Sequence, residues 1–270
     1  MVAGANSPGR STNPSSKYSS FKQDLAAKKV PIFEPENLTG GEFLQKIKQL
    51  KPELFVCIGY PLKLTIRILE IPRSVVNFHA SLLPAYRGRP PVFWALRNNE
   101  RYSGLTIHEM DENLDEGDIY YQKKVKIKKD DTVFTLYERI MKKSSPLVRK
   151  LVIDFSGHKL EKNPQSRKNA SYYSSTTEDD FRICWDKKAE DIKRWISITP
   201  GRCFTEIGEK KAFLVSPKII DQKKGKKPGT VVSITDTVID IATKDNIIQL
   251  EKVMVGNREI NASKFSRRLA

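Results

Sequence analysis

Apolar and polar positions along the first 160 residues follow two different periods. In some segments the apolar residues recur three and four positions apart, which predicts amphipathic helices. In others they run on continuously for five or six residues, which is typical of strands covered on both faces. This alternation predicts an α/β domain with a mostly parallel, Rossmann-like sheet. The predicted helices cover 20–29, 40–53, 90–100 and 132–155, and the predicted strands cover 54–59, 74–79, 102–111 and 118–127.

The pattern changes after Lys159. A polar connector over 162–180 is followed by a predicted helix at 187–198 and then by short alternating strands separated by Gly, Asp and Asn. Short strands at such spacing indicate a small antiparallel barrel or sandwich, and of the two we expect an OB-like β-barrel. We therefore expect two domains, 1–160 and 166–270. The predicted strands of the second domain are 204–208, 211–220, 229–235, 237–243 and 247–254.

Composition narrows the class of protein. Hydrophobic residues make up 39% of the chain and charged residues 30%, enough for packed cores. No apolar run approaches the roughly 20 residues of a membrane span, and the N-terminus does not read as a secretory signal. Three cysteines without CxxC spacing indicate reduced thiols, so we expect a cytoplasmic protein. The net charge of +16 suits nucleic acid or phosphorylated ligands, although a generally lysine-rich surface would explain it equally well.

Two polar side chains end the buried strand at 74–79. Asn77 and His79 are two positions apart, so the pleat places them on one face at the carboxyl end of the strand. The acidic loop 110–118 is the obvious source of a carboxylate partner. An Asn, a His and a carboxylate together can stabilise an oxyanion and move a proton. Taken singly, each of these polar residues has a structural explanation. We interpret His108 as a structural residue.

A longer motif surrounds these residues. It reads Asn77-Phe78-His79-Ala80-Ser81-Leu82-Leu83-Pro84, then Arg87-Gly88, and later Leu114-Asp115-Glu116-Gly117. The order and spacing resemble the folate-dependent formyltransferase family, and the resemblance spans most of the chain. Within the family, this sequence most resembles the branch that acts on methionyl-tRNA. Residues 166–270 are similar to the small C-terminal domain of that branch.

The resemblance implies a role for each matching position. Asn77 and His79 would polarise the formyl carbonyl, and Asp115 would orient His79 and help to relay the proton. The co-substrate would be 10-formyltetrahydrofolate, held by Tyr60, Pro61, Leu62, Lys63, Asp111 and Leu114. The residues implied for the acceptor are Arg10, Ser81, Leu82, Leu83, Pro84, Arg87, Gly88 and Arg89.

No metal is expected, since the chain has only three histidines and His158 is remote from the motif.

Two departures from the family pattern leave the acceptor open. The chain starts at what resembles the family's second strand, so we expect an N-terminally shortened catalytic domain. Arg89 precedes a proline where the tRNA branch has small residues, which is more like the branch acting on amino-sugar nucleotides. The first expectation is formyl transfer to initiator methionyl-tRNA, with phosphate contacts from Lys223, Lys224, Lys226 and Lys227. The alternatives are an amino-sugar nucleotide as acceptor, and an inactive RNA-binding remnant.

Overall fold

The structure is a computed structural model that describes residues 2–3, 23–33, 40–60, 63–207, 210–220, 225–255 and 258–262. Arg10, Pro61, Leu62, Lys223 and Lys224, named above, lie outside these residues. The chain forms two compact units. The first comprises Met1–His79, Thr106–Tyr121 and Leu160–Ser166, and the second comprises Ala80–Leu105, Gln122–Lys159 and Arg167–Ala270. The predicted domain boundaries, 1–160 and 166–270, stay predictions.

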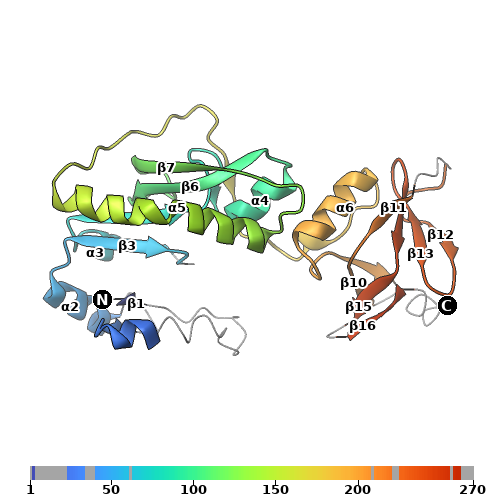
Figure 1. Cartoon of the computed structure of the whole chain (residues 1–270), viewed down its shortest axis with the longest axis horizontal. Coiled ribbons are helices and arrows are strands. Elements are labelled where there is room, and N and C mark those ends of the chain that lie inside the picture. The colour runs from blue at the N-terminus through green and yellow to red at the C-terminus, as the bar shows by residue number, and fades with distance from the viewer. Residues whose placement is uncertain are drawn as a thin grey trace. The chain divides into compact units, whose positions relative to one another are not determined.

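The first unit alternates strands and helices as predicted. β3 (Leu54–Ile58) and β4 (Ser74–His79) are parallel neighbours, connected through the short helix α3 (Ile66–Leu69) (Figure 1). β6 (Tyr102–Glu109) pairs with β4 in the antiparallel direction, and β7 (Ile119–Lys126) completes the order β3-β4-β6-β7. The prediction of a Rossmann-like α/β fold is confirmed, with a sheet that is mixed rather than uniformly parallel.

β4 is buried along its whole length because both faces of the strand are covered. Its side chains are all buried except that of Asn77, which is half-buried. The helix α2 (Gly41–Leu50) turns Phe43 and Ile47 inward, one helical turn apart, to pack against Val75. A continuous apolar run in the sequence thus becomes a strand whose last polar residues are held rigidly.

The remaining described elements of the first unit are short. A helix covers 23–27, and β1 (Val2–Ala3) pairs in parallel with β2 (Ile32–Phe33). β3 is an outer strand of its four-stranded order, and its Val56 and Ile58 are 40% and 51% exposed.

The second unit begins at Ala80, within the sequence motif that starts at Asn77. α4 (Pro91–Arg97) starts with proline, whose missing N–H is not needed in a first helical turn. α5 (Val133–Ser156) starts from a capping box in which Thr132 and Thr135 exchange side-chain and backbone hydrogen bonds. β5 (Arg87–Gly88) forms a short parallel ladder with β8 (Tyr172–Tyr173).

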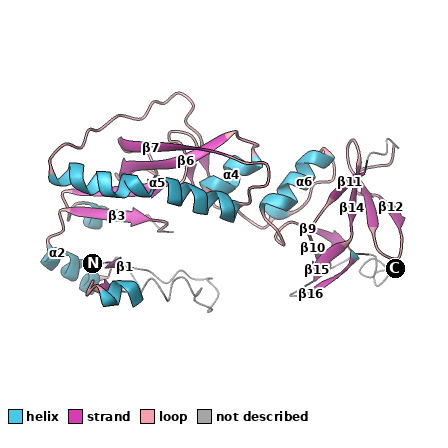
Figure 2. Cartoon of the chain, in the orientation of Figure 1, coloured by secondary structure: helices cyan, strands magenta, loops and turns pink. Residues whose placement is uncertain are grey.

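The C-terminal part of this unit holds two antiparallel four-stranded sheets, with orders β16-β15-β10-β9 and β11-β14-β13-β12 (Figure 2). The helix α6 (Ala189–Ile198) packs Ile192 and Ile196 into their shared core. The predicted antiparallel C-terminal domain is therefore confirmed. The strands are β9 (Phe204–Ile207), β10 (Lys210–Leu214), β11 (Lys218–Ile220), β12 (Val231–Ile234), β13 (Ile239–Ala242), β14 (Ile247–Leu250), β15 (Lys252–Val255) and β16 (Arg258–Asn261), and a 3-10 turn covers Asp179–Phe181.

Two predicted strands, 211–220 and 247–254, are each broken in the structure. The first breaks at Ser216, which is left-handed with φ of 48°, and at Pro217, which cannot donate to a ladder. The second breaks at Glu251. Each break carries the chain from one sheet into the other, so both long predictions were wrong in the same way.

Candidate active site

The candidate site lies at the carboxyl end of β4, in the first unit. The β4–β6 register places Asn77 opposite His108 and His79 opposite Thr106. Residues two apart in a strand share a face, so Asn77 and His79 point the same way. His79 and His108 are 6% and 2% exposed, and their rings meet edge to face with centroids 6.3 Å apart.

Asp115 brings a buried carboxylate to these side chains. It follows β6 in the acidic loop, adopts a left-handed backbone with φ of 55°, and is 8% exposed. Its Oδ1 lies 3.3 Å from Asn77 Nδ2 and 3.4 Å from His108 Nε2, and its Oδ2 lies 3.5 Å from His79 Nδ1. The motif residues Asn77, His79 and Asp115 are therefore close neighbours in the structure.

The loop that carries Asp115 is held close to β6. Gln165 Nε2 donates to the backbone oxygens of Asp115 and Gly117, at 2.8 Å each. A Cβ on Gly117 would lie 2.1 Å from the Glu109 carbonyl oxygen, so only glycine allows this approach. These contacts explain why a turn rich in acidic residues presents one particular carboxylate to the site.

The hydrogen bonds of His108 define the network around Asn77. His108 Nδ1 lies 2.7 Å from the Glu109 carbonyl oxygen, which can only accept, so Nδ1 carries a proton. In the neutral ring Nε2 then accepts from Asn77 Nδ2 at 3.3 Å, and the second amide hydrogen of Asn77 points to Asp115. Both bonds are at the long end of the usual range, so a carbonyl entering the site can compete for them.

His108, whose sequence context predicted a structural role, contacts Asn77 and Asp115 and therefore belongs to the site. The antiparallel pairing of β6 with β4 creates this contact, and a sequence pattern alone does not reveal that pairing.

His79 presents its two ring nitrogens to different surroundings. Nδ1 faces Asp115, so Nε2 lies on the far side of the imidazole. A carboxylate at Nδ1 fixes the tautomer and stabilises the charged ring after Nε2 takes a proton. This arrangement can serve a reaction in which an amine loses a proton as it attacks a carbonyl.

The nearest thiol is not a nucleophile. Burial raises the pKa of Cys57 to about 11, with the negative charge of Asp115 adding to the effect and a hydrogen bond involving the Tyr60 backbone opposing it. The thiol is therefore protonated at neutral pH, and covalent catalysis through Cys57 is not supported.

The predicted folate residues that the structure describes belong to two segments, the one that follows β3 and the acidic loop that carries Asp115. Tyr60 is half-buried at the end of the β3 segment, and Lys63 is exposed. Asp111 caps the acidic loop by accepting from the Asn113 amide at 2.7 Å, and Leu114 is 52% exposed beside Asp115. An exposed leucine next to buried polar groups offers apolar surface to a flat ring.

Most of the predicted acceptor residues belong to the second unit and build a rigid loop. Ser81 Oγ donates to the Ala85 carbonyl at 2.7 Å, and the Leu83 carbonyl accepts from Gln122 Nε2 at 2.6 Å. Gly88 has φ of 90°, and a Cβ there would lie 2.0 Å from the Tyr173 carbonyl oxygen. Leu82 and Pro84 are half-buried.

The two arginines of this loop differ in exposure. Arg87 is 6% exposed, donates to the Tyr172 hydroxyl and lies over that ring. Arg89 is exposed and donates to Ser175 Oγ at 3.0 Å. Of the two guanidinium groups, that of Arg89 is the one accessible to an acceptor.

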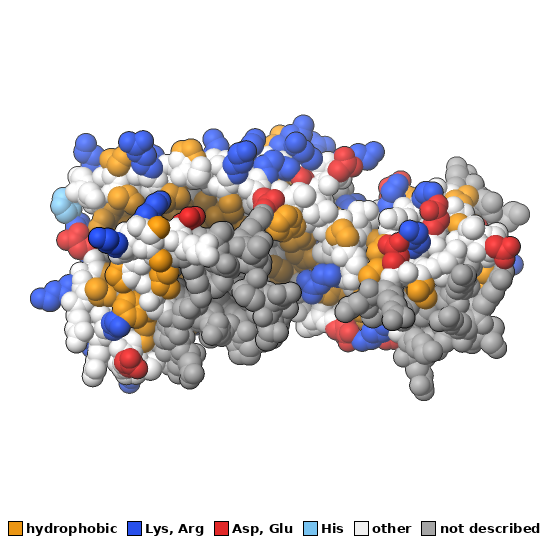
Figure 3. All heavy atoms as spheres, turned by 60° about the horizontal axis from the view of Figure 1, so that its bottom comes forward, with side chains coloured by type: hydrophobic (Ala, Val, Ile, Leu, Met, Phe, Trp, Pro, Cys, Tyr) orange, Lys and Arg blue, Asp and Glu red, His pale blue; other side chains and the backbone are white. Residues whose placement is uncertain are grey.

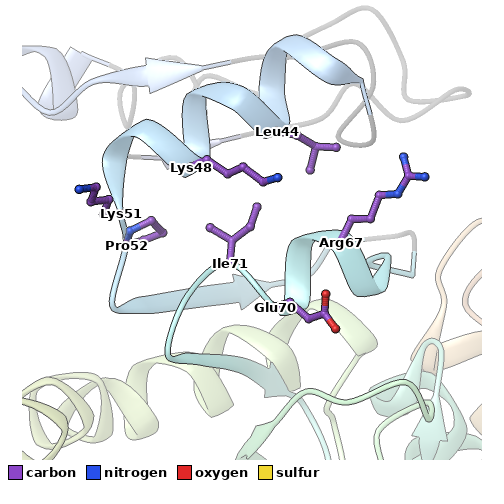
Figure 4. A pocket seen from close by; sticks show the side chains of 7 residues that line it. All are labelled: Leu44, Lys48, Lys51, Pro52, Arg67, Glu70 and Ile71. Atoms are coloured by element: carbon purple, nitrogen blue, oxygen red, sulfur yellow. The ribbon is translucent and has the colours of Figure 1, made fainter.

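A separate cavity of about 670 Å³ in the first unit lies away from this chemistry. Lys48, Lys51 and Arg67 line it, with Glu70 and Ile71, between α2 and α3 (Figure 4). Lys51 and Pro52 precede β3 and Ile71 precedes β4, so the cavity adjoins the amino ends of these parallel strands. Ligands of open α/β sheets bind at the carboxyl ends, where Asn77 and His79 lie.

The described part of the chain contains no cluster of side chains arranged to hold a metal ion. Within those ranges no helix is both long and apolar enough to cross a membrane.

Comparison with known proteins places this geometry in a family. Residues 4–151 match the model of the formyl transferase family, and residues 176–270 match the model of its C-terminal domain. The methionyl-tRNA formyltransferase of Alkaliphilus oremlandii is 30% identical over 241 residues, covering 88% of this chain and 78% of that protein. The methionyl-tRNA formyltransferase of Clostridium acetobutylicum is 28% identical over 254 residues, covering 92% of this chain and 82% of that protein.

Solved structures share the fold. HypX from Aquifex aeolicus, in complex with tetrahydrofolic acid, aligns with a TM-score of 0.65 and 16% identity over 98% of this chain and 46% of that one. A sugar N-formyltransferase from Shewanella sp. aligns with a TM-score of 0.62 and 18% identity, and the alignment covers 80% of this chain and 96% of that one. With both family models matched in order along most of its length, the chain belongs to the formyl transferase family and is a formyl-transferring enzyme.

Proposed function

We propose that this protein transfers the formyl group of 10-formyltetrahydrofolate to the α-amino group of methionyl-tRNA in the cytosol. The observation that carries the proposal is the meeting of Asn77, His79 and Asp115 at the end of β4. The acceptor is inferred from the names of the relatives that match most of the chain.

Each residue of the cluster has a proposed part in one displacement. As the amine nitrogen attacks the formyl carbon, Asn77 Nδ2 donates to the carbonyl oxygen while it becomes negative. His79 Nε2 accepts the proton that the amine loses and returns it to the folate nitrogen as the carbon–nitrogen bond to folate breaks. Asp115 holds Nδ1 of His79 throughout, and His108 orients Asn77.

The folate would lie along the loops that flank the cluster. Leu114 and Tyr60 supply apolar surface, and the exposed Lys63 suits an anionic tail. Asp111 and the segment containing Pro61 and Leu62 complete the proposed contacts. The structure of HypX with tetrahydrofolic acid is a precedent for folate on this fold.

Positive charge favours an RNA acceptor. Lys and Arg side chains gather along one edge of the face in Figure 3, and acidic side chains are fewer there. Such charge binds phosphates without reading sequence. Arg89, which directly follows Arg87-Gly88 of the motif, is one proposed contact, and Arg10, which lies outside the described residues, is another. The exposed lysines of β7 and the turn after it are Lys123, Lys124, Lys126, Lys128 and Lys129, and Lys226 and Lys227 are exposed as well.

An amino-sugar nucleotide is the second candidate acceptor. The Arg89-Pro90 sequence favours it, as do the sugar N-formyltransferases among the structural neighbours. In this reading Arg89, exposed beside the motif loop, would bind the diphosphate.

The deciding experiment supplies 10-formyltetrahydrofolate with either charged initiator tRNA or an amino-sugar nucleotide. We expect transfer to the tRNA, and a loss on the order of 100-fold or more in rate for His79→Asn. His158→Asn is the matched control, because His158 is exposed, remote in sequence and left-handed with φ of 54°, which Asn tolerates. Transfer only to the sugar would replace the acceptor, and an active His79→Asn protein would overturn the site.

A further inference from the structure

A second cavity, of about 470 Å³, lies in the second unit where α5 begins. Val92 and Phe93 of α4, Phe134 and Tyr137 of α5, and Phe181 give it a mostly apolar and aromatic lining. Ala80, the residue that follows His79 in the sequence, also lines it. A volume of this size suits a small molecule or a single nucleotide rather than a helix or a duplex.

Two aromatic rings of this lining are accessible to solvent. Phe134 is 62% exposed and Tyr137 is 40% exposed. Phe134 lies in the first turn of α5 and Tyr137 follows it by three positions, so both rings lie on one face of the helix. The capping box at Thr132 fixes this turn, so the rings are presented on a rigid element.

One positive charge adjoins the rings. Arg202 is exposed, and its guanidinium carbon lies 3.9 Å from the centroid of the Phe181 ring. Across the part of the chain that the structure describes, no carboxylate forms an ion pair with it. The charge is therefore available to an anion that approaches the cavity.

Two threonine hydroxyls of the lining are engaged in hydrogen bonds within the protein. Thr132 Oγ1 accepts from the Thr135 amide at 3.1 Å, and Thr199 Oγ1 donates to the Trp195 carbonyl at 3.0 Å. The cavity thus offers flat apolar surfaces and one cation, with few hydrogen bonds that could read a particular base. Single-stranded nucleic acid is bound in this way, through stacking and phosphate contact.

We infer that this cavity binds the unpaired 3′-terminal nucleotide of the RNA acceptor, with its base against Phe134 and Tyr137 and a phosphate at Arg202. The inference rests on the proposed function and adds a subsite to it. A methionine side chain would fill only part of the cavity and would leave Arg202 without a counterion.

The test is a binding measurement on the full chain with two uncharged tRNA probes, one intact and one lacking its 3′-terminal nucleotide. For Phe134→Ala we expect the affinity for the intact tRNA to fall on the order of 10-fold, and the affinity for the shortened tRNA to stay unchanged. Ile153→Ala is the control, because Ile153 is 57% exposed on the same helix and does not line the cavity. For Arg202→Gln we expect a shallower dependence of affinity on salt, by about one phosphate contact.

The outcomes separate this inference from the proposed function. If the protein binds both tRNAs but Phe134→Ala weakens both equally, the terminal nucleotide lies elsewhere and only the inference fails. If the wild-type protein does not bind tRNA and formylates an amino-sugar nucleotide instead, the proposed acceptor fails and the inference fails with it. Equal losses for Phe134→Ala and Ile153→Ala would also overturn it.

Discussion

Asp115 in the first unit and Asp131 in the second are both buried carboxylates, 8% and 5% exposed, yet their surroundings differ in kind. Asp131 accepts from both terminal nitrogens of Arg139 and from the Lys128 amide at 2.6 Å. Asp115 faces an amide and two imidazoles at 3.3 to 3.5 Å.

The difference lies in what each carboxylate's partners can do. A bidentate pair with arginine is strong, directional and always charged, so Asp131 holds one conformation of the turn before α5. Imidazoles change charge near neutral pH, and long bonds leave room for a substrate to take over a partner. Burial alone therefore does not distinguish a structural aspartate from a functional one.

The largest expected effect comes from Asp115→Asn. The amide can no longer fix the His79 tautomer or stabilise its charge, so we expect kcat to fall on the order of 100-fold or more. The unfolding midpoint in urea should change little, because the lost contacts are long. A variant that retains near wild-type kcat would mean that His79 works without this carboxylate.

Asp131→Asn should have the opposite effect, lowering the stability of the protein and leaving kcat unchanged. Removing one partner of a buried, hydrogen-bonded pair is expected to lower the free energy of unfolding by about 3 kcal/mol, with kcat unchanged below the melting transition. Asp130→Asn in the same turn is the control, because Asp130 is exposed. Equal stabilities of the two variants in urea would show that the Arg139 pair adds nothing.

The same pair predicts how stability depends on pH. Burial alone would raise the pKa of Asp131, but hydrogen bonds from Arg139 and from the Lys128 amide outweigh it, and the pKa is lowered. A carboxylate with a lowered folded-state pKa adds stability above its unfolded-state pKa of about 4, and that stability is lost as the pH falls through the folded-state pKa. The difference in stability between wild type and Asp131→Asn should thus be constant from neutral pH to about pH 5 and shrink below about pH 4. A difference that grew on acidification would contradict this sign.

The smallest expected effect reports the charge on Asp115 directly. That charge helps to raise the pKa of Cys57, so Asp115→Asn should lower the pKa from its value of about 11 without removing the larger effect of burial. The measurement is the pH dependence of alkylation at Cys57 in a Cys184→Ser background, since Cys184 is the exposed thiol. An unchanged profile would indicate that Asp115 carries no charge in the resting protein.

The sequence was most informative where local pattern and chemistry coincide. The apolar run ending in Asn77 and His79 predicted a buried strand with polar groups at its carboxyl end, and the structure has both. The family resemblance then named Asp115 among several acidic residues of one loop. Periodicity could not have chosen it, because Gly117 and Gln165 position that carboxylate through contacts distant in sequence.

The features that the sequence did not predict depend on pairing between distant segments. His108 meets Asn77 because β6 runs antiparallel to β4, and no local pattern specifies that register. The strands break after Leu214 and after Leu250 because at each point the chain passes from one antiparallel sheet to the other. Long apolar stretches look like single strands until the second sheet is known.

The ladder between Arg87–Gly88 and Tyr172–Tyr173 also bears on how the protein is made. The ladder joins segments 85 positions apart in the sequence. Arg87 and Gly88 therefore cannot form it until the 85 residues that follow them have left the ribosome. The residues of β4 are synthesised well before this, and domains generally fold as units from the N-terminus. The loop containing Arg87 and Gly88 is therefore completed late in synthesis. A chain interrupted before Tyr172 would contain Asn77, His79 and Asp115 but not the strand that pairs with this loop.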